Sequence, residues 1–178
     1  MRKWKKYVIT AAVRNRLISL QKHLRYKAFS GVETADNVAR LCVMNLYLHG
    51  IGGEESLIDV NDSLESDRGQ RYDQVLTNPP FGKKSSITVI NAGGKASREA
   101  ITYERNDFWA TTSNKQLNFV QHIKTLLKIN GMAAMVVPDN VLFEGGAGET
   151  IRRKLLHECD VHTLLRLPTG VQYAQVMG

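Results

Sequence analysis

The sequence predicts an α/β fold with a mostly parallel sheet, and three observations support this prediction. Short apolar runs of strand length alternate along the chain with longer stretches of helical spacing. The 178 residues suffice for one domain with a buried core, and 43% of them are hydrophobic. Glu33, Asp62 and Asn78 each end or follow a predicted strand. Because ligands bind at the carboxyl ends of strands in open α/β sheets, these three residues predict one shared site.

The first predicted element is a helix within residues 4–27, where apolar residues recur at helical spacing. Residues 1–27 contain nine Lys and Arg and no acidic residue, whereas the remainder has 15 basic and 17 acidic residues. The net charge of +7 therefore originates in this segment. A basic helix can contact nucleic-acid phosphates or can simply be solvated, and the sequence leaves both interpretations open.

The other elements follow in order, separated by turn-forming residues. Thr34 or Asp36 is expected to cap the helix that follows the first strand, and Gly131 is expected to end a later helix. Residues 82–113 lack clear periodicity and predict a long loop, which in a compact domain is usually functional or mobile. Strands are predicted at residues 28–33, 57–60, 72–77, 132–137 and 161–167, and helices at residues 34–49, 116–129 and 149–158.

Composition argues against several classes of protein. The two cysteines, Cys42 and Cys159, are too few for a disulfide framework, and no His/Cys spacing suggests a zinc site. No apolar run approaches 18 residues and no signal-peptide pattern is present, so we expect no membrane partner and a cytoplasmic location. The histidines are scattered and are interpreted as structural: His23, His49, His122, His157 and His162.

The most informative stretch is Asn78-Pro79-Pro80-Phe81, which directly follows a predicted strand. Two prolines give a stiff loop that offers carbonyl acceptors, and Asn78 adds a side-chain acceptor. Phe81 adds a flat apolar face for stacking. Acceptors beside a stacking face suit a planar amine, such as the exocyclic amino group of a base. The alternative is an ordinary Pro-Pro turn after a buried strand.

In several segments the sequence resembles the amino-methylating DNA methyltransferases, most closely the methylation subunit of type I restriction–modification systems. The segments occur in the order of that family: Phe-Ser-Gly-Val-Glu (29–33), Ala-Arg-Leu-Cys-Val-Met-Asn-Leu-Tyr-Leu-His-Gly-Ile (39–51), Asn-Asp-Ser-Leu (61–64), Asn-Pro-Pro-Phe-Gly (78–82), Asn-Gly-Met-Ala-Ala-Met-Val-Val-Pro-Asp-Asn-Val-Leu-Phe (130–143) and Leu-Arg-Leu-Pro-Thr-Gly-Val (165–171). The resemblance implies a Rossmann-like, S-adenosylmethionine-dependent methyltransferase core that methylates N6 of a flipped adenine in DNA.

The resemblance also implies roles for individual residues. Asn78, Pro79, Pro80 and Phe81 correspond to the catalytic target-base motif, whose fourth residue is commonly Phe in adenine-methylating relatives. Glu33 corresponds to the acid that binds the cofactor ribose, although it can instead cap the following helix. Asp62 corresponds to the acid near the cofactor adenine, although Asn61 replaces the usual Gly there and an ordinary Asx turn is the alternative.

The resemblance further implies partners, namely double-stranded DNA and the specificity and restriction subunits of a type I complex. Basic residues of the 82–113 segment can contact phosphates or can line a solvated loop: Lys83, Lys84, Lys95, Arg98 and Arg105.

One part of the family pattern is missing. The glycine-rich strand and turn that approach the methionine part of S-adenosylmethionine do not occur in the sequence. We therefore expect a basic helix at 1–27 and a partial catalytic domain at 28–178, truncated at both ends, with an incomplete cofactor site and weak or no cofactor binding by this chain alone. Two alternatives stay open: a non-catalytic remnant or interaction module, and an RNA or protein amino-methyltransferase.

Overall fold

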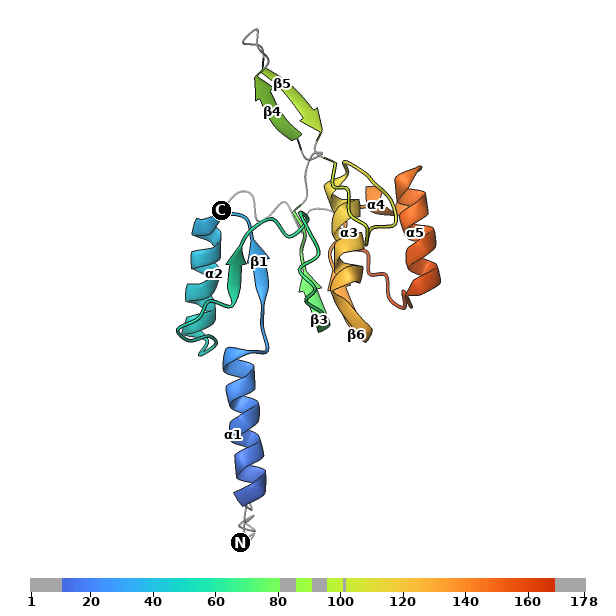
Figure 1. Ribbon diagram of the computed structural model, residues 1–178. Coiled ribbons are helices and arrows are strands. Elements are labelled where there is room, and N and C mark those ends of the chain that lie inside the picture. The colour runs from blue at the N-terminus through green and yellow to red at the C-terminus, as the bar shows by residue number, and fades with distance from the viewer. Residues whose placement is uncertain (1–10, 81–85, 91–95, 101, 169–178) are drawn as a thin grey trace. The chain divides into compact units, whose positions relative to one another are not determined.

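The computed structural model describes residues 11–80, 86–90, 96–100 and 102–168 (Figure 1). The density of internal contacts divides the chain into two compact units, Met1–Glu65 and Ser66–Gly178. Each unit combines helices with short parallel strands, so the fold is mixed α/β.

The first unit contains α1 (Ala11–Tyr26), β1 (Gly31–Glu33), α2 (Asp36–Leu48) and β2 (Ile58–Val60). Strands β1 and β2 are parallel and in register from Gly31↔Ile58 to Glu33↔Val60. Because α2 connects them, the three elements form a βαβ unit, as the sequence predicted. The expected cap was wrong: Ala35 is the N-cap of α2, and no side chain caps it. Neither Thr34 nor Asp36 fills that role.

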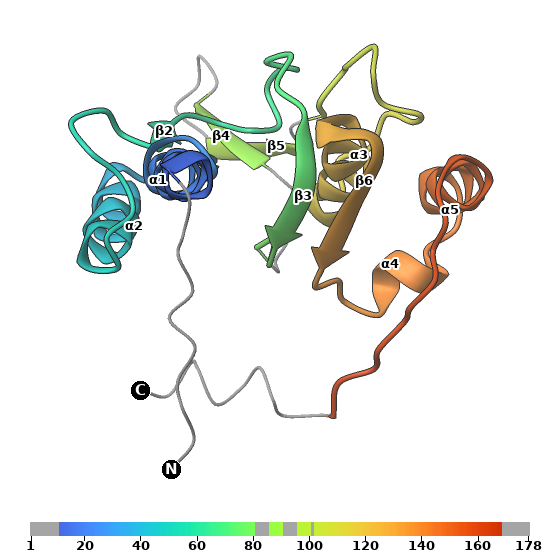
Figure 2. The ribbon, with the colours of Figure 1, turned by 90° about the horizontal axis from the view of Figure 1, so that it is seen from below.

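The second unit contains the strands β3 (Tyr72–Thr77), β4 (Ser86–Ile90), β5 (Ala96–Ala100) and β6 (Leu127–Met135) and the helices α3 (Lys115–Leu126), α4 (Asn140–Phe143) and α5 (Ala147–Glu158). Strands β3 and β6 are parallel, with Leu76 opposite Ala134. Helix α3 packs against this pair (Figure 2). The core of the unit joins α3, α4 and α5 through Leu117, Val120, Val141 and Ile151.

The 82–113 segment differs from the predicted loop, because β4 and β5 form an antiparallel hairpin with Ile87 opposite Glu99 and Val89 opposite Ser97. The physical reason lies in the β-branched run Ile87-Thr88-Val89-Ile90, which favours strand backbone. The run is short and lies in a stretch that contains glycine and serine, so the sequence did not predict a strand there.

The sequence predicts that Gly131 ends the helix that is α3, but this prediction is wrong. The helix ends at Leu126, and β6 begins at the next residue. Gly131 lies inside β6 where the pairing with β3 shifts register, beside Asn130 with its φ of 63°. A Cβ on Gly131 would lie 2.9 Å from the Lys128 carbonyl oxygen and 3.0 Å from that of Tyr72. Glycine is therefore required by close backbone approach within a strand.

The predicted strand at 161–167 is also absent, since these residues have no strand partner among the residues that the structure describes. Strand backbone requires a neighbour for its hydrogen bonds, and an apolar run does not supply one. Leu164 and Leu165 consequently remain 70% and 79% exposed. Among the helices that the structure describes, none is both long and apolar enough to cross a membrane.

Candidate functional site

Glu33 is the last residue of β1 and is half-buried. Its Oε1 atom accepts hydrogen bonds from the Ala35 backbone N–H at 2.9 Å and from the Thr34 hydroxyl at 3.2 Å. The carboxylate therefore ties the end of β1 to Ala35, the residue before α2, but it does not cap that helix. Both bonds reach Oε1, so Oε2 retains the capacity to accept a hydrogen bond from a ligand.

Asp62 follows β2 at the same edge of the β1–β2 pair. The Asn61 N–H donates to the Glu33 carbonyl at 3.0 Å, which continues the parallel ladder and brings this loop beside Glu33. Asp62 Oδ1 accepts from the Leu64 N–H at 2.9 Å, and the Leu64 side chain is fully buried. An Asx turn is thus present at Asp62, and it anchors the loop to the core.

Asn78 follows β3 at the carboxyl edge of the β3–β6 pair and is exposed, whereas Pro79 is buried and Pro80 is exposed. The Val136 N–H donates to the Thr77 carbonyl at 3.1 Å, so the ladder extends to the residue before Asn78. Phe81 lies outside the described residues. Asn78 belongs to the second unit, and its approach to Glu33 and Asp62 stays a prediction.

A polar network beside this edge was missed by sequence reasoning. Asn114 is the N-cap of α3, and its Oδ1 accepts from the backbone N–H groups of Gln116 at 3.0 Å and Leu117 at 3.4 Å. Its Nδ2 donates to Glu144 Oε2 at 2.5 Å. An asparagine three residues before the first buried leucine of a helix is a recognised cap signal. The Glu144 partner had no sequence signal, because it lies 30 residues away.

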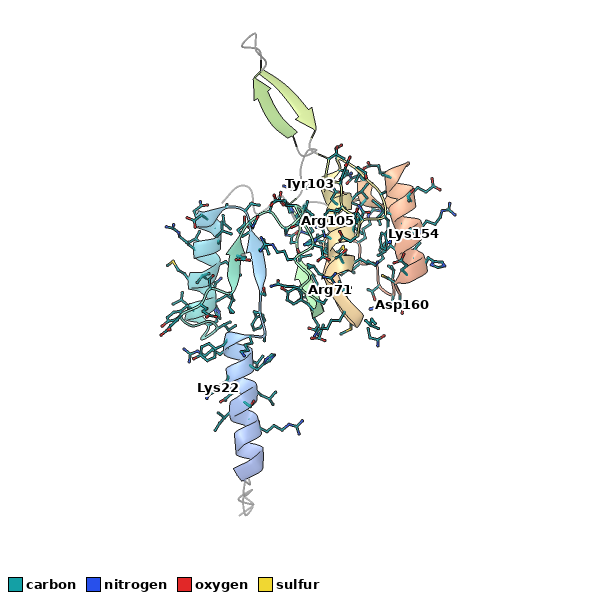
Figure 3. All side chains as sticks on the ribbon, in the orientation of Figure 1. Lys22, Arg71, Tyr103, Arg105, Lys154 and Asp160 are labelled. Atoms are coloured by element: carbon teal, nitrogen blue, oxygen red, sulfur yellow. The ribbon has the colours of Figure 1, made fainter. Side chains whose placement is uncertain are left out.

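The Arg105 side chain is only 3% exposed. Its charge is therefore not accessible to nucleic-acid phosphates, and it does not line a solvated loop. Its guanidinium pairs with Asp107 at 2.6 Å and stacks over the Phe108 ring at 4.3 Å. Figure 3 labels Arg105 among the side chains of this unit. Burial raises the pKa of Asp107, but hydrogen bonds from Arg105 and Thr125 outweigh burial and hold that pKa below its usual value. Arg105 is therefore a structural cation, which corrects both interpretations of it.

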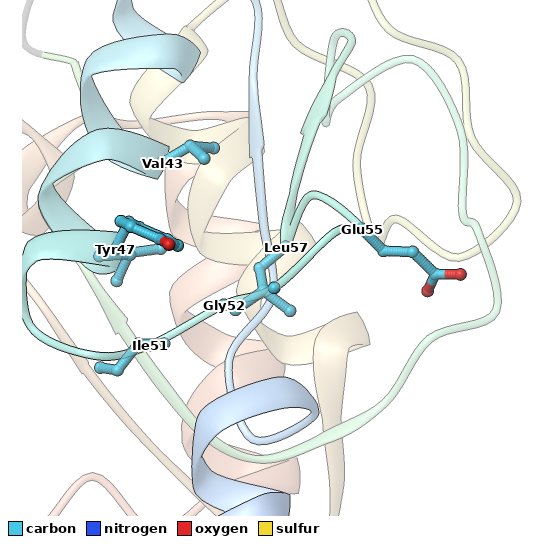
Figure 4. Close-up of a pocket in the computed structure, with 8 residues that line it drawn as sticks. Val43, Tyr47, Ile51, Gly52, Glu55 and Leu57 are labelled. Carbon is cyan, nitrogen blue, oxygen red and sulfur yellow. The ribbon is translucent and has the colours of Figure 1, made fainter.

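The first unit also has a small pocket, but it does not lie at the predicted cofactor edge. Its lining comes from the last turns of α2 and from the segment that leads into β2 (Figure 4). Glu33 and Asp62 follow the opposite, carboxyl ends of β1 and β2, where ligands of α/β sheets bind. The lining residues are Val43, Leu46, Tyr47, Ile51, Gly52, Gly53, Glu55 and Leu57.

The described part of the chain contains no group of three or more His, Cys, Asp or Glu residues that is placed to hold a metal ion. His122 is buried, and its Nδ1 lies 3.3 Å from Arg105 Nη1. His49 Nδ1 lies 2.8 Å from the Asn45 carbonyl oxygen within α2. Both rings thus have protein partners of their own.

Comparison with known proteins matches residues 8–177 to the family described as N-6 DNA methylase. The chain is 44% identical over 155 residues to the type I restriction enzyme StySPI methylase subunit of Salmonella potsdam, and 43% identical over 156 residues to the EcoKI methylase subunit of Escherichia coli K12. Each match covers 84% of this chain and 26% of the relative.

A more distant relative, the type I restriction enzyme EcoEI methylase subunit of Escherichia coli, is 33% identical over 143 residues. That match covers 79% of this chain and again 26% of the relative, so the chain spans about a quarter of the length of the curated relatives it matches. The family match extends over nearly the whole sequence and includes both strand edges described above. This chain belongs to the N-6 DNA methylase family.

Proposed function

We propose that this chain is the catalytic segment of a type I restriction–modification methylation subunit, which transfers a methyl group from S-adenosylmethionine to N6 of adenine in DNA. The observation that carries the proposal is Asn78-Pro79-Pro80 at the carboxyl end of parallel strand β3, within the family match. The names of the relatives support the wider assignment.

The exposed amide of Asn78 suits the role of acceptor for the target amine. When the amine donates its hydrogens to fixed acceptors, lone-pair density remains on nitrogen and the nitrogen becomes a better nucleophile. The buried ring of Pro79 fixes the loop, so the acceptor is held in place before the substrate arrives. Phe81 completes the proposed set as the stacking surface for the flipped base.

Glu33 and Asp62 fit the cofactor side of the reaction. S-adenosylmethionine supplies the electrophilic methyl group when it is bound. Glu33 is held by two hydrogen bonds on Oε1, so its Oε2 is oriented in advance to accept from ribose hydroxyls. Asp62, fixed by its turn to Leu64, would face the adenine amine of the cofactor.

We further propose that the β1–β2 and β3–β6 pairs are two parts of one Rossmann-like sheet. Both pairs are parallel, and both carry their proposed site residues at the carboxyl edge. In such a sheet Glu33, Asp62 and Asn78 would all belong to the carboxyl ends of the strands. The proposed partners are double-stranded DNA and the specificity and restriction subunits, in the cytoplasm.

The test places this chain in the EcoKI methylase subunit, in exchange for the matching segment. We expect transfer of labelled methyl to DNA, with N6-methyladenine as the product identified by mass spectrometry. Asn78→Ala should abolish transfer and leave cofactor binding nearly intact, because Asn78 acts at the reacting amine. Gln74→Ala, an exposed amide on the same strand, is the matched control and should retain activity. Equal loss of cofactor affinity and rate in Asn78→Ala would make that residue structural.

A further inference from the structure

The segment that follows β6 shares a sheet edge with Asn78. Residues 136–144, here called the β6–α5 loop, begin where the Val136 N–H donates to the Thr77 carbonyl at 3.1 Å. Because β3 and β6 are parallel neighbours, both chains leave the sheet at this edge. Asp139 is the N-cap residue of α4 but makes no capping hydrogen bond, and its side chain is 71% exposed. The β6–α5 loop therefore presents the exposed Asp139 carboxylate, which lies 3.7 Å from Arg166, after the sheet edge that Asn78 also follows.

Two side chains from the neighbouring helices hold the β6–α5 loop in place. Asn114, at the start of α3, donates from Nδ2 to Glu144 Oε2 at 2.5 Å. Arg152, in α5, donates from Nη1 to the Val141 carbonyl at 3.0 Å. Val141, whose carbonyl accepts from Arg152, is 5% exposed and packs in the core with Leu117. The loop is thus anchored on its inner side and exposed on its outer side.

The Asn114 contact does more than cap a helix. An N-cap needs only an acceptor, and Asp or Ser serves as well as Asn. The side-chain oxygen of Asn114 fills this role toward Gln116 and Leu117. Its amide donates in addition to a carboxylate, and a hydrogen bond to an ionised acceptor is roughly twice as strong as one between neutral groups. Asn114 is 8% exposed, so little water competes for this bond.

We propose that Asn114 is a positioning residue for methyl transfer, which acts through Glu144 to hold the β6–α5 loop as a second wall of the target-base site beside Asn78. This inference rests on the proposed function. Its physical basis is that reacting groups displaced by about 1 Å can lose on the order of 100-fold in rate. A loop anchored by a charge-assisted bond at the same sheet edge restricts such displacement.

The experiment exchanges donor and acceptor between the two side chains. Asn114→Asp keeps an excellent cap acceptor but removes the donor and sets a carboxylate against Glu144. The double variant Asn114→Asp/Glu144→Gln restores one hydrogen bond with the roles reversed. In the active chimaeric subunit, Asn114→Asp should lower kcat about 10- to 100-fold with an unchanged KM for S-adenosylmethionine. The double variant should recover most of that loss.

Asn118→Asp is the matched control. Asn118 is also buried on α3 and donates from Nδ2, but to the Thr112 carbonyl at 2.9 Å and not to Glu144. Amide hydrogen exchange gives a readout that needs no activity: Asn114→Asp should speed exchange at Leu142 and Glu144, and Asn118→Asp should not.

Three results would overturn the inference. One is an equal fall in kcat for Asn114→Asp and Asn118→Asp at equal thermal stability. Another is a double variant that regains stability but not rate, and a third is unchanged exchange in the β6–α5 loop. If the parent chimaera transfers no methyl to DNA, the proposed function fails, while the exchange measurement still decides whether Asn114 and Glu144 hold the loop.

Discussion

Glu33 and Asp62 illustrate how far single residues can be interpreted from sequence. Their positions at strand ends were predicted correctly, since Glu33 ends β1 and Asp62 follows β2. Their local bonds, to Ala35 and Leu64, are those of ordinary turn chemistry. A carboxylate that stiffens its own loop is also better placed for a ligand, so the two roles are compatible.

Gly148 gives a prediction at this scale about packing around the β6–α5 loop. It is buried in the first turn of α5, and an added Cβ would lie 3.1 Å from Arg152 Nη1 and 3.2 Å from Glu144 Cβ. Alanine normally stabilises a helix over glycine by roughly 0.5–1 kcal/mol. Here overpacking, which costs about 1–3 kcal/mol, should win, so Gly148→Ala should lower the free energy of unfolding in urea.

Gly145→Ala is the control for that substitution. Its Cβ would meet nothing within 4 Å, and its φ is not in the left-handed region. We expect a change of less than about 0.5 kcal/mol. If both alanine variants were equally stable, close packing at Gly148 would be disproved.

Asp67 gives a prediction about pH. Two hydrogen bonds from Arg71 and one from the Gly69 N–H lower the pKa of Asp67 to about 2. Because this pKa lies below the unfolded value, the pair stabilises the fold above about pH 4 and loses its contribution as pH falls toward 2. Partial exposure of both side chains limits that contribution to about 0.5–1 kcal/mol.

The measurement is an NMR titration of the Asp67 carboxyl carbon. Arg71→Ala should return the pKa toward its ordinary value and flatten the acid loss of stability. Arg153→Ala, which removes the exposed Arg153–Glu149 pair, should leave the Asp67 titration unchanged. A titration near pH 4 in the parent chain would contradict the pairing.

At the scale of elements, α3 buries several polar side chains beside its apolar ones, where a helix usually buries apolar residues. Gln121 is 1% exposed, and its amide pairs with both backbone groups of Ala110, accepting at 2.9 Å and donating at 3.0 Å. The Gln121 amide therefore satisfies the Ala110 N–H and carbonyl in the way that the backbone of a neighbouring strand would. Gln121→Glu should cost about 1–3 kcal/mol, because it places a carboxylate against the Ala110 carbonyl and leaves that acceptor unpaired.

The measurement for Gln121→Glu is urea unfolding at neutral pH. Gln74→Glu, an exposed position on β3, is the control and should be nearly neutral. A loss for Gln121→Glu no larger than the control value would show that the Ala110 contacts contribute nothing net.

Elements bounded by a strong local signal were predicted well, and those that depend on distant partners were not. Strand β3 has the predicted bounds, because the Pro-Pro pair ends it sharply. By contrast, Leu126-Leu127-Lys128-Ile129 fits both helical and strand periods, and only pairing with β3 assigns Leu127–Met135 to a strand. The run at 161–167 is the opposite case, since it has strand composition but pairs with none of the described strands.

At the scale of the whole molecule, the sequence indicated the family and the α/β class. The comparisons confirm the family and the resemblance to type I restriction enzyme methylase subunits. The sequence did not indicate the polar contacts that fix the loops of the second unit. Asn114–Glu144 and Arg105–His122 span 30 and 17 residues, and no periodicity connects such pairs. A motif can be found within a few residues, whereas the side-chain contacts that position it join residues far apart in the sequence.

The β3–β6 pair carries the last prediction, which concerns association of whole molecules. By register, Gln74 and Leu76 share one face with Met132 and Ala134. Leu76 is 80% exposed and Met132 60% exposed. Among the described strands, β3 and β6 pair only with each other, so each also has an open edge. An apolar face with open edges favours contact between copies of a chain.

We therefore expect this chain alone to self-associate at concentrations of about 10–100 µM, in the range where exposed strand edges promote aggregation. Leu76→Lys/Met132→Lys should shift it toward monomer in sedimentation velocity without loss of folded structure, because neither side chain contributes to the core. Leu164→Lys/Leu165→Lys adds the same charge at residues of similar exposure that belong to neither β3 nor β6, and it should leave association unchanged. A parent chain that is monomeric throughout this range, or equal dissociation by both double variants, would show that this sheet face does not drive the association.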